Sequence, residues 1–172
     1  MKYNFGKTIL LFLPLVLLMQ SCWLYKFSGT TSIPPGMKTV SVDFFENVAP
    51  LVVPTLSQSF TEQLKTRIRT QTNLGLIRDN ADGNFQGRIT DYNIAPVAVT
   101  ANEQANLVRL TITVSVKYTN TIDPTQDFEQ AFSRYQEFSI ANATIQQQEP
   151  KIIADVNKML IEDIFNKAFA SW

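Results

Sequence analysis

Residues 107–118 read LVRLTITVSVKY, and this strictly alternating stretch points to the fold. Every second position is apolar: Val108, Leu110, Ile112, Val114, Val116 and Tyr118. The positions between them carry Arg, Thr, Ser and Lys. Because successive side chains of a strand point to opposite faces, the pattern predicts a half-buried strand with one face on a core and the other face polar and open.

The chain that follows this strand predicts another strand and a long helix. After a turn at Pro124, a second strand is marked by Phe128, Phe132, Phe138 and Ile140. A helix from about Pro150 to Ala170 then carries a core stripe of Ile153, Val156, Leu160, Ile164 and Ala168.

The same helix carries a second apolar stripe, well around its circumference from the first: Ile161, Phe165, Phe169 and Trp172. A helix that is apolar over more than half of its surface is usually buried on two sides. One interpretation buries this stripe between the sheet and the first helix. The other makes Phe165, Phe169 and Trp172 a contact with a partner protein.

The chain before residue 107 predicts a strand and a helix. Residues 38–44 alternate between apolar and polar side chains and predict a half-buried strand. The proline-containing segment Asn47–Pro54 predicts a loop, and a helix begins near Pro54 and ends before Gly75. Its apolar stripe is Leu56, Phe60, Leu64 and Ile68.

A hairpin and a bulge are predicted next. Residues 76–78 and a strand from Phe85 flank the turn-forming sequence Asp79–Gly83, which ends in Asp-Gly. Phe85, Gly87 and Ile89 share one parity, whereas Tyr92 and Ile94 share the other. A change of parity within one extended segment indicates a β-bulge or a bend.

These elements predict an α+β fold, a two-layer sandwich with two helices packed on one face of a four- to five-stranded, mostly antiparallel sheet. We expect residues 37–172 to form this single domain, because its length is sufficient to bury a substantial core.

The N-terminus predicts an exported lipoprotein. A short basic segment precedes the apolar run Ile9–Met19, which is too short to span a bilayer comfortably, and Ser21-Cys22 follows closely. We expect residues 1–21 to be a signal peptide and residues 22–36 a tether whose lipidated Cys22 anchors the protein to a membrane. The alternatives are an ordinary cleaved signal with an incidental cysteine, or an uncleaved anchor. Cys22 is the only cysteine, and lipidation gives that thiol a role.

Chemical motifs are sparse in this sequence. It contains no histidine, 15 Lys+Arg and 15 Asp+Glu. It has no phosphate-binding glycine loop, no catalytic constellation and no basic run typical of nucleic-acid binding. The segment Asp79–Gly83 lacks the ligand spacing of a calcium loop. We therefore expect no catalytic residue, metal or cofactor, and no nucleic-acid partner.

Basic residues of the sheet suggest a weaker hypothesis. Arg109 and Lys117 lie on the polar face of their strand, and Arg134 lies on the neighbouring one. Such groups could contact the phosphates of a lipid headgroup, since guanidinium forms bidentate bonds to phosphate. The alternative is that they are solvated surface charges paired with nearby carboxylates.

Several segments resemble the LptE family of lipopolysaccharide-assembly lipoproteins. They comprise Tyr25–Gly29, Ser32–Pro35, the strand Lys38–Asn47, the segment Ala49–Gln58 and the motif Gly87–Tyr92. They occur in the order and at the spacing of the family across nearly all of the chain that follows Cys22.

The resemblance implies two helices packed on a small sheet and a location at the periplasmic face of the outer membrane. Members of the family plug a large β-barrel translocon, so the resemblance implies an LptD-like partner and lipopolysaccharide as a further candidate ligand. Only Cys22 is carried over as a functional residue.

A different periplasmic lipoprotein is the competing hypothesis. The order of strand, proline loop and amphipathic helix also occurs in lipoproteins that activate cell-wall synthases or form secretion channels. Such a module would bind a synthase or self-assemble, and it would not depend on any barrel.

Overall fold

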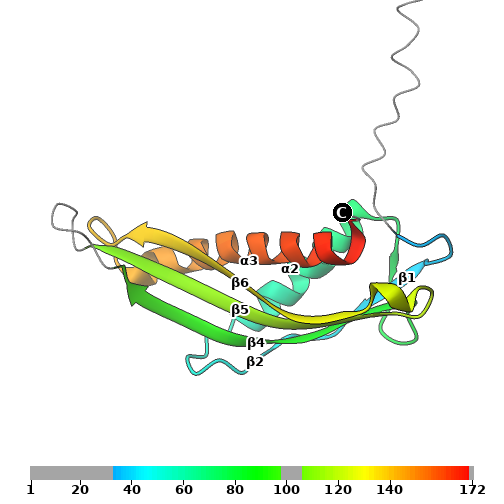
Figure 1. The fold of residues 1–172 in the computed structure, drawn as a ribbon. Coiled ribbons are helices and arrows are strands. Elements are labelled where there is room, and N and C mark those ends of the chain that lie inside the picture. Colours follow the sequence, from blue (N-terminus) through cyan, green and yellow to red (C-terminus); the bar gives the residue numbers. More distant parts are fainter. Residues whose placement is uncertain (1–32, 98–105, 171–172) are drawn as a thin grey trace, which may run out of the picture. The chain divides into compact units, whose positions relative to one another are not determined.

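The computed structural model describes residues 33–97 and 106–170 (Figure 1). The strands are β1 (Thr39–Val42), β2 (Glu46–Asn47), β3 (Gly75–Leu76), β4 (Gly83–Pro96), β5 (Leu107–Asn120) and β6 (Phe128–Ser139). The helices are α2 (Leu56–Gln71), α3 (Ile145–Phe169) and the short 3-10 helix η2 (Pro124–Gln126).

The strands form one six-stranded sheet in the order β3-β1-β4-β5-β6, with β2 pairing to β4 beside β1. The expected α+β fold is confirmed. The sheet is mixed rather than purely antiparallel. The long strands β4, β5 and β6 pair antiparallel, whereas the short strand β1 pairs parallel with both β3 and β4, and β2 pairs parallel with β4. The strand predicted over residues 107–118 is β5, at the centre of the antiparallel part.

The predicted hairpin between residues 76–78 and Phe85 is wrong, because β1 lies between its two strands. Val40 of β1 pairs with Leu76 of β3 on one side and with Gly83 of β4 on the other. The carboxylate of Asp82 accepts hydrogen bonds from the backbone N–H groups of Lys38 and Thr39, at 2.8 and 2.9 Å. The turn-forming segment thus crosses the start of β1 and satisfies its free donors.

The predicted bulge is confirmed. The register between β4 and β5 shifts between Ile89 and Asp91, where Thr90 is the extra residue. Ile89 and Tyr92 are both buried on the core side, although they are three residues apart. Without a bulge, residues three apart on a strand would point to opposite faces. The extra residue Thr90 lets both Ile89 and Tyr92 point into the core.

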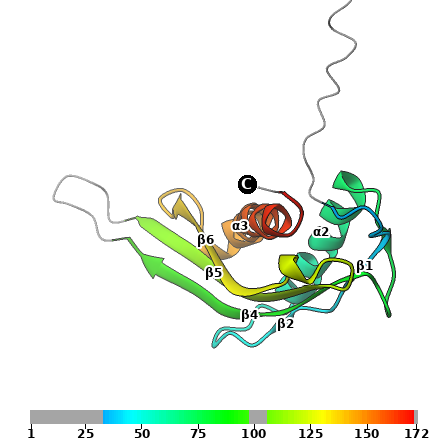
Figure 2. The same cartoon turned by 45° about the vertical axis from the view of Figure 1, so that its right-hand side comes forward.

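Both helices lie on the same face of the sheet (Figure 2). The predicted stripe of α2 is buried, with Leu56, Phe60, Leu64 and Ile68 each 0% exposed. Helix α3 begins earlier than the predicted Pro150, because Thr144 and Gln147 form a capping box. The Thr144 hydroxyl accepts from the Gln147 N–H, and the Gln147 side chain accepts from the Thr144 N–H. Pro150 is accommodated inside the helix.

The second stripe of α3 belongs to the core. Phe165 is 6% exposed and Phe169 is 0% exposed. The ring of Phe169 lies 5.8 Å from that of Phe85 and 5.9 Å from that of Tyr118. The alternative of burial therefore holds for these two residues, whose side chains are not available to a partner. Trp172 lies outside the described residues.

Candidate interaction surfaces

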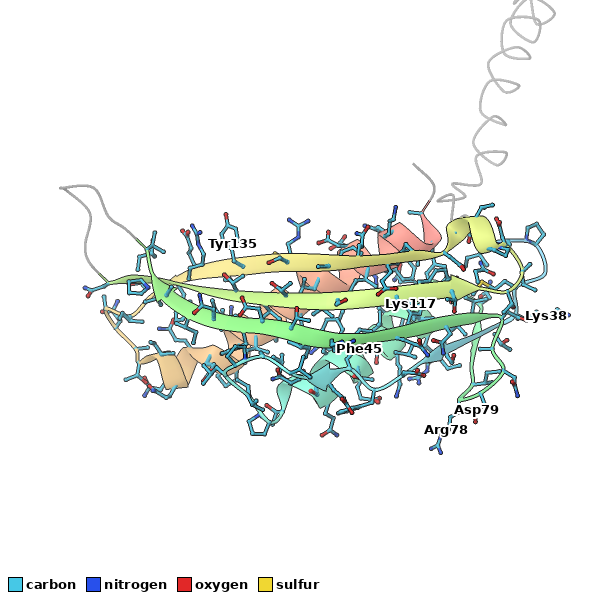
Figure 3. The ribbon with its side chains drawn as sticks, turned by 60° about the horizontal axis from the view of Figure 1, so that its bottom comes forward. Lys38, Phe45, Arg78, Asp79, Lys117 and Tyr135 are labelled. Carbon is cyan, nitrogen blue, oxygen red and sulfur yellow. The ribbon has the colours of Figure 1, made fainter. Side chains whose placement is uncertain are left out.

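The face of the sheet opposite the helices is polar, as the alternation of residues 107–118 predicted. Pairing places the outward residues of three strands side by side, with Asp91 opposite Thr113 and Thr113 opposite Ser133. We call this surface the open sheet face; it comprises Arg88, Asp91, Asn93, Arg109, Thr111, Thr113, Ser115, Lys117, Glu129, Ser133, Tyr135 and Glu137. Figure 3 shows Lys117 and Tyr135 toward different ends of it. Threonine and serine hydroxyls dominate its centre, so the surface can form many hydrogen bonds without a concentrated charge.

Arg109 is held in place at one end of the open sheet face. Its Nε donates to Glu137 Oε1 at 3.0 Å, and its guanidinium carbon lies 4.3 Å from the centre of the Tyr135 ring. The hydrogen bond to Glu137 raises the pKa of Arg109 above its ordinary value. Arg109 is thus a surface charge paired with a carboxylate, as the alternative to the phosphate hypothesis expects.

The three predicted phosphate-contacting residues do not share a face. Arg134 of β6 points to the helix side, where its Nε donates to Asp163 Oδ2 of α3 at 2.6 Å. That hydrogen bond raises the pKa of Arg134. Lys117 is exposed on the open sheet face, in a shallow depression with Gln86, Arg88 and Glu129. A single phosphate therefore cannot be bound by Arg134 together with Arg109 and Lys117.

An exposed apolar segment, not predicted from the sequence, lies in the connection between β1 and α2. Its side chains are Phe44, Val48, Leu51 and Val52, which are 58, 52, 55 and 58% exposed. The backbone around them is anchored to β4, because the N–H groups of Asp43 and Val48 donate to the carbonyls of Phe85 and Ile89, each at 2.9 Å. The only sign of it in the sequence is that the loop around Pro50 and Pro54 is rich in apolar residues. We call these four side chains the apolar segment.

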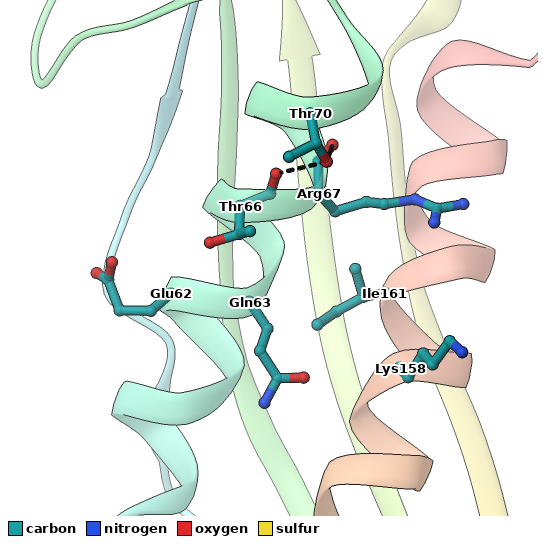
Figure 4. A pocket seen from close by; sticks show the side chains of 7 residues that line it. All are labelled: Glu62, Gln63, Thr66, Arg67, Thr70, Lys158 and Ile161. Carbon is teal, nitrogen blue, oxygen red and sulfur yellow. Dashed lines mark hydrogen bonds between the residues drawn. The ribbon is translucent and has the colours of Figure 1, made fainter.

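A cavity of about 350 Å³ lies between the two helices (Figure 4). Ile161 points into it from α3, and Arg67 extends from α2 toward α3. The guanidinium carbon of Arg67 is 5.2 Å from the centre of the Phe165 ring, and its Nε is buried without a hydrogen-bond partner. The aliphatic stem and planar head of Arg67 thus complete the packing between the helices.

Cys22 lies outside the described residues. Within residues 33–97 and 106–170, no helix is both long and apolar enough to cross a membrane. Over the same residues, no group of three or more Asp or Glu side chains is arranged to hold a metal ion.

The fold and these surfaces define a class of protein: a small α+β domain whose helices cover one sheet face and leave a polar face open. Several solved structures share this fold. A minor lipoprotein from Acinetobacter baumannii is 18% identical, covering 78% of this chain and 92% of its own, with a TM-score of 0.52. An uncharacterized lipoprotein B from Nitrosomonas europaea is 13% identical, covering 82% and 87%, with a TM-score of 0.53. A hypothetical protein from Chlamydia trachomatis is 10% identical, covering 78% and 99%, with a TM-score of 0.57.

The family is shown by sequence. Residues 37–168 match the model of the LptE lipopolysaccharide-assembly family, and the chain belongs to that family. The resemblance noted in the sequence, to a family of lipopolysaccharide assembly, is thereby confirmed. A comparison with curated proteins finds no match.

Proposed function

We propose that this protein is a lipid-anchored component of the outer membrane. It acts there, on the periplasmic side, as the plug and assembly partner of the β-barrel translocon that inserts lipopolysaccharide into the outer leaflet. Family membership over residues 37–168 supports the process, and the open sheet face supports the mode of action.

The open sheet face is the observation that carries the proposal. The lumen of a large outer-membrane barrel is polar and water-filled, in contrast to its lipid-facing wall. A surface rich in threonine and serine hydroxyls, such as Thr111, Thr113 and Ser133, can form hydrogen bonds to such a wall. An apolar face of the same size would be poorly matched to this polar wall.

The apolar segment supplies a second contact in the proposal. Large apolar side chains that are exposed close together along one segment often mark an interaction site, because leaving them in water is unfavourable. Phe44, Val48, Leu51 and Val52 lie on an anchored backbone rather than on a free chain end. In the proposed complex, they pack against apolar side chains at the rim of the barrel.

The test is affinity purification of the tagged full-length protein from detergent-solubilised outer membranes, with the co-eluting proteins identified and quantified by mass spectrometry. We expect one large β-barrel to be recovered, at close to one copy for each copy of this protein. Recovery of a cell-wall synthase, or of a homo-oligomer without a barrel, would overturn it and establish the competing lipoprotein module.

The lipid anchor is tested separately. The proposal expects Cys22 to incorporate radiolabelled palmitate and the protein to fractionate with outer membranes. The variant Cys22→Ala should lose the palmitate label. Palmitate incorporation that persists in Cys22→Ala, or a label-free wild-type protein, would contradict lipidation at this residue.

A further inference from the structure

A second cavity, distinct from the one between the helices, lies beside the sheet and gathers basic side chains. Its volume is about 350 Å³. Lys65 and Arg69 of α2 form one wall, Arg78 of the turn after β3 forms another, and Val42, Asp43 and Ile77 complete it. We call this cavity the basic pocket. Figure 3 shows Arg78 on the turn that connects β3 to β4.

Two elements that are distant in sequence create the convergence. Lys65 and Arg69 are four residues apart on a helix and therefore lie on one face. Arg78 is brought opposite them because β3 pairs with β1 at the edge of the sheet and the chain then turns at residues 77–82. Arg78 would not reach α2 in the hairpin that the sequence predicted, so the basic pocket depends on the observed strand order.

The cations of the basic pocket are poorly neutralised. Among the described residues, Asp43 is the only acidic side chain that lines it, and Lys65 is paired with Glu62 at 2.9 Å. Neither Arg69 nor Arg78 forms an ion pair or hydrogen bond with any described residue, whereas Arg109, Arg134 and Lys151 each have a carboxylate partner. Positive charge exceeds negative charge even when Glu62 is counted.

From this geometry we propose that the basic pocket binds a phosphate group. The guanidinium groups of Arg69 and Arg78 can each donate two parallel hydrogen bonds, and the ammonium of Lys65 adds further N–H donors. Because these groups come from opposite walls, they can contact several oxygens of one phosphate. A phosphate monoester carries a charge of about −1.5 to −2 at neutral pH, which compensates the excess positive charge better than one carboxylate does.

The walls also indicate what kind of molecule carries the phosphate. Ile77 is 40% exposed at the pocket, and the side chain of Val42 lies beside it. An apolar portion attached to the phosphate would cover these side chains. A phospholipid headgroup and a soluble phosphorylated molecule both offer the phosphate chemistry, and they differ in whether an apolar portion follows.

The experiment uses the full-length protein in neutral detergent and measures the binding of two probes. One probe is radiolabelled pyrophosphate, followed by equilibrium dialysis. The other is phosphatidic acid in mixed micelles, compared with phosphatidylcholine. The double variant Arg69→Gln/Arg78→Gln is matched by Lys151→Gln/Lys158→Gln, which removes the same charge from an exposed surface of α3. Circular dichroism verifies that both variants fold.

We expect the Arg69→Gln/Arg78→Gln variant to bind either probe at least about tenfold more weakly, since it loses two charge-assisted contacts, and the matched variant to bind as the wild type does. Binding of phosphatidic acid alone identifies a lipid source, and comparable binding of pyrophosphate identifies a soluble one. Failure of both probes to bind the wild type, or an equal loss in the matched variant, overturns the proposal.

Discussion

Gly87 shows how one residue of the family motif Gly87–Tyr92 acts through packing. A side chain at this position would collide with the ring of Phe45 and with the backbone carbonyl oxygen of Ser115. Phe45 is fully buried and packs on Phe60 of α2, with ring centres 5.1 Å apart. Only glycine lets the β1–β2 connection approach β4 this closely.

Gly87→Ala is therefore expected to lower the free energy of unfolding by about 1–3 kcal/mol, the usual cost of overpacking a core. Gly75→Ala is the matched control, because a side-chain carbon there meets Lys38 O at an ordinary 3.6 Å. Chemical denaturation of the two variants and the wild type provides the measurement. Equal stability of Gly87→Ala and Gly75→Ala would show that Phe45 can move aside at little cost.

Asp82 makes stability depend on pH. Its carboxylate accepts from the backbone N–H groups of Lys38 and Thr39 and from the Thr39 hydroxyl, and these bonds lower its pKa below the ordinary 3.8. A lowered pKa in the folded state stabilises the fold above the pKa of the unfolded chain, and this contribution is lost as the pH falls through the folded value.

The variant Asp82→Asn should consequently be less stable than the wild type by a constant amount from about pH 5 to 7. The difference should narrow as the pH falls below 3.8 toward the lowered pKa of the folded carboxyl, because the unfolded chain takes up the proton first. Urea denaturation at several pH values measures it. A difference that stays the same at pH 3 would mean that the charge of Asp82 contributes nothing.

The alternation of side chains along β6 explains why Arg134 does not lie beside Arg109. Arg134 shares the parity of Phe132 and Phe138, both of which are buried on the helix side of β6. The same alternation that predicted the open face of β5 therefore placed Arg134 on the opposite face from Arg109. The exposure of the apolar segment was harder to predict, because apolar residues in a loop are as consistent with burial as with a contact surface.

At the scale of elements, Tyr92 joins β4 to the first turns of α3. Its hydroxyl donates to Glu149 Oε1 at 2.5 Å, and the residue as a whole is 2% exposed. Burial raises the pKa of Tyr92 above its ordinary value, and the bond to Glu149 raises it further, so the hydroxyl keeps its proton throughout the neutral range.

Tyr92→Phe should cost roughly 1.5–3 kcal/mol of unfolding free energy, because it removes a hydrogen bond to a charged group and keeps the ring. Tyr135→Phe is the control, since Tyr135 is 53% exposed on the open sheet face. Thermal denaturation followed by circular dichroism compares them. Destabilisation of the same size in both variants would mean that the link from Tyr92 to α3 is not specific.

Element types could be predicted from the sequence, but the strand order was assigned wrongly. Period-2 and period-3.6 patterns located β5, β6, α2 and α3, and a parity change located the bulge. The Asp82-Gly83 turn favoured a local hairpin, whereas the observed pairing is non-local. The alternation of strand, helix and strand through α2 is typical of a parallel crossover, which would have placed β3 beside β1. The basic pocket depends on the position of β3 beside β1, so it could not be predicted from a sequence interpretation that paired β3 with β4.

At the scale of the whole molecule, the core lies on one side of the sheet, and the proposed function places barrel binding on the other side. The helix side contains the aromatic core around Phe169, and the open sheet face contains hydroxyl groups. A substitution on the helix side should act through folding. A substitution on the open face should act through binding.

Thr113→Lys tests this division, because it places a long charged side chain at the centre of the open sheet face. We expect it to reduce the amount of barrel recovered with the tagged protein several-fold, while the melting temperature stays close to that of the wild type. Ala154→Lys adds the same charge to an exposed position of α3 and should leave recovery unchanged. Phe169→Ala should lower the unfolding free energy by about 3–5 kcal/mol, and any loss of barrel should track that loss of fold. Undiminished recovery with Thr113→Lys would exclude the open sheet face as the barrel-contacting surface and direct attention to the apolar segment.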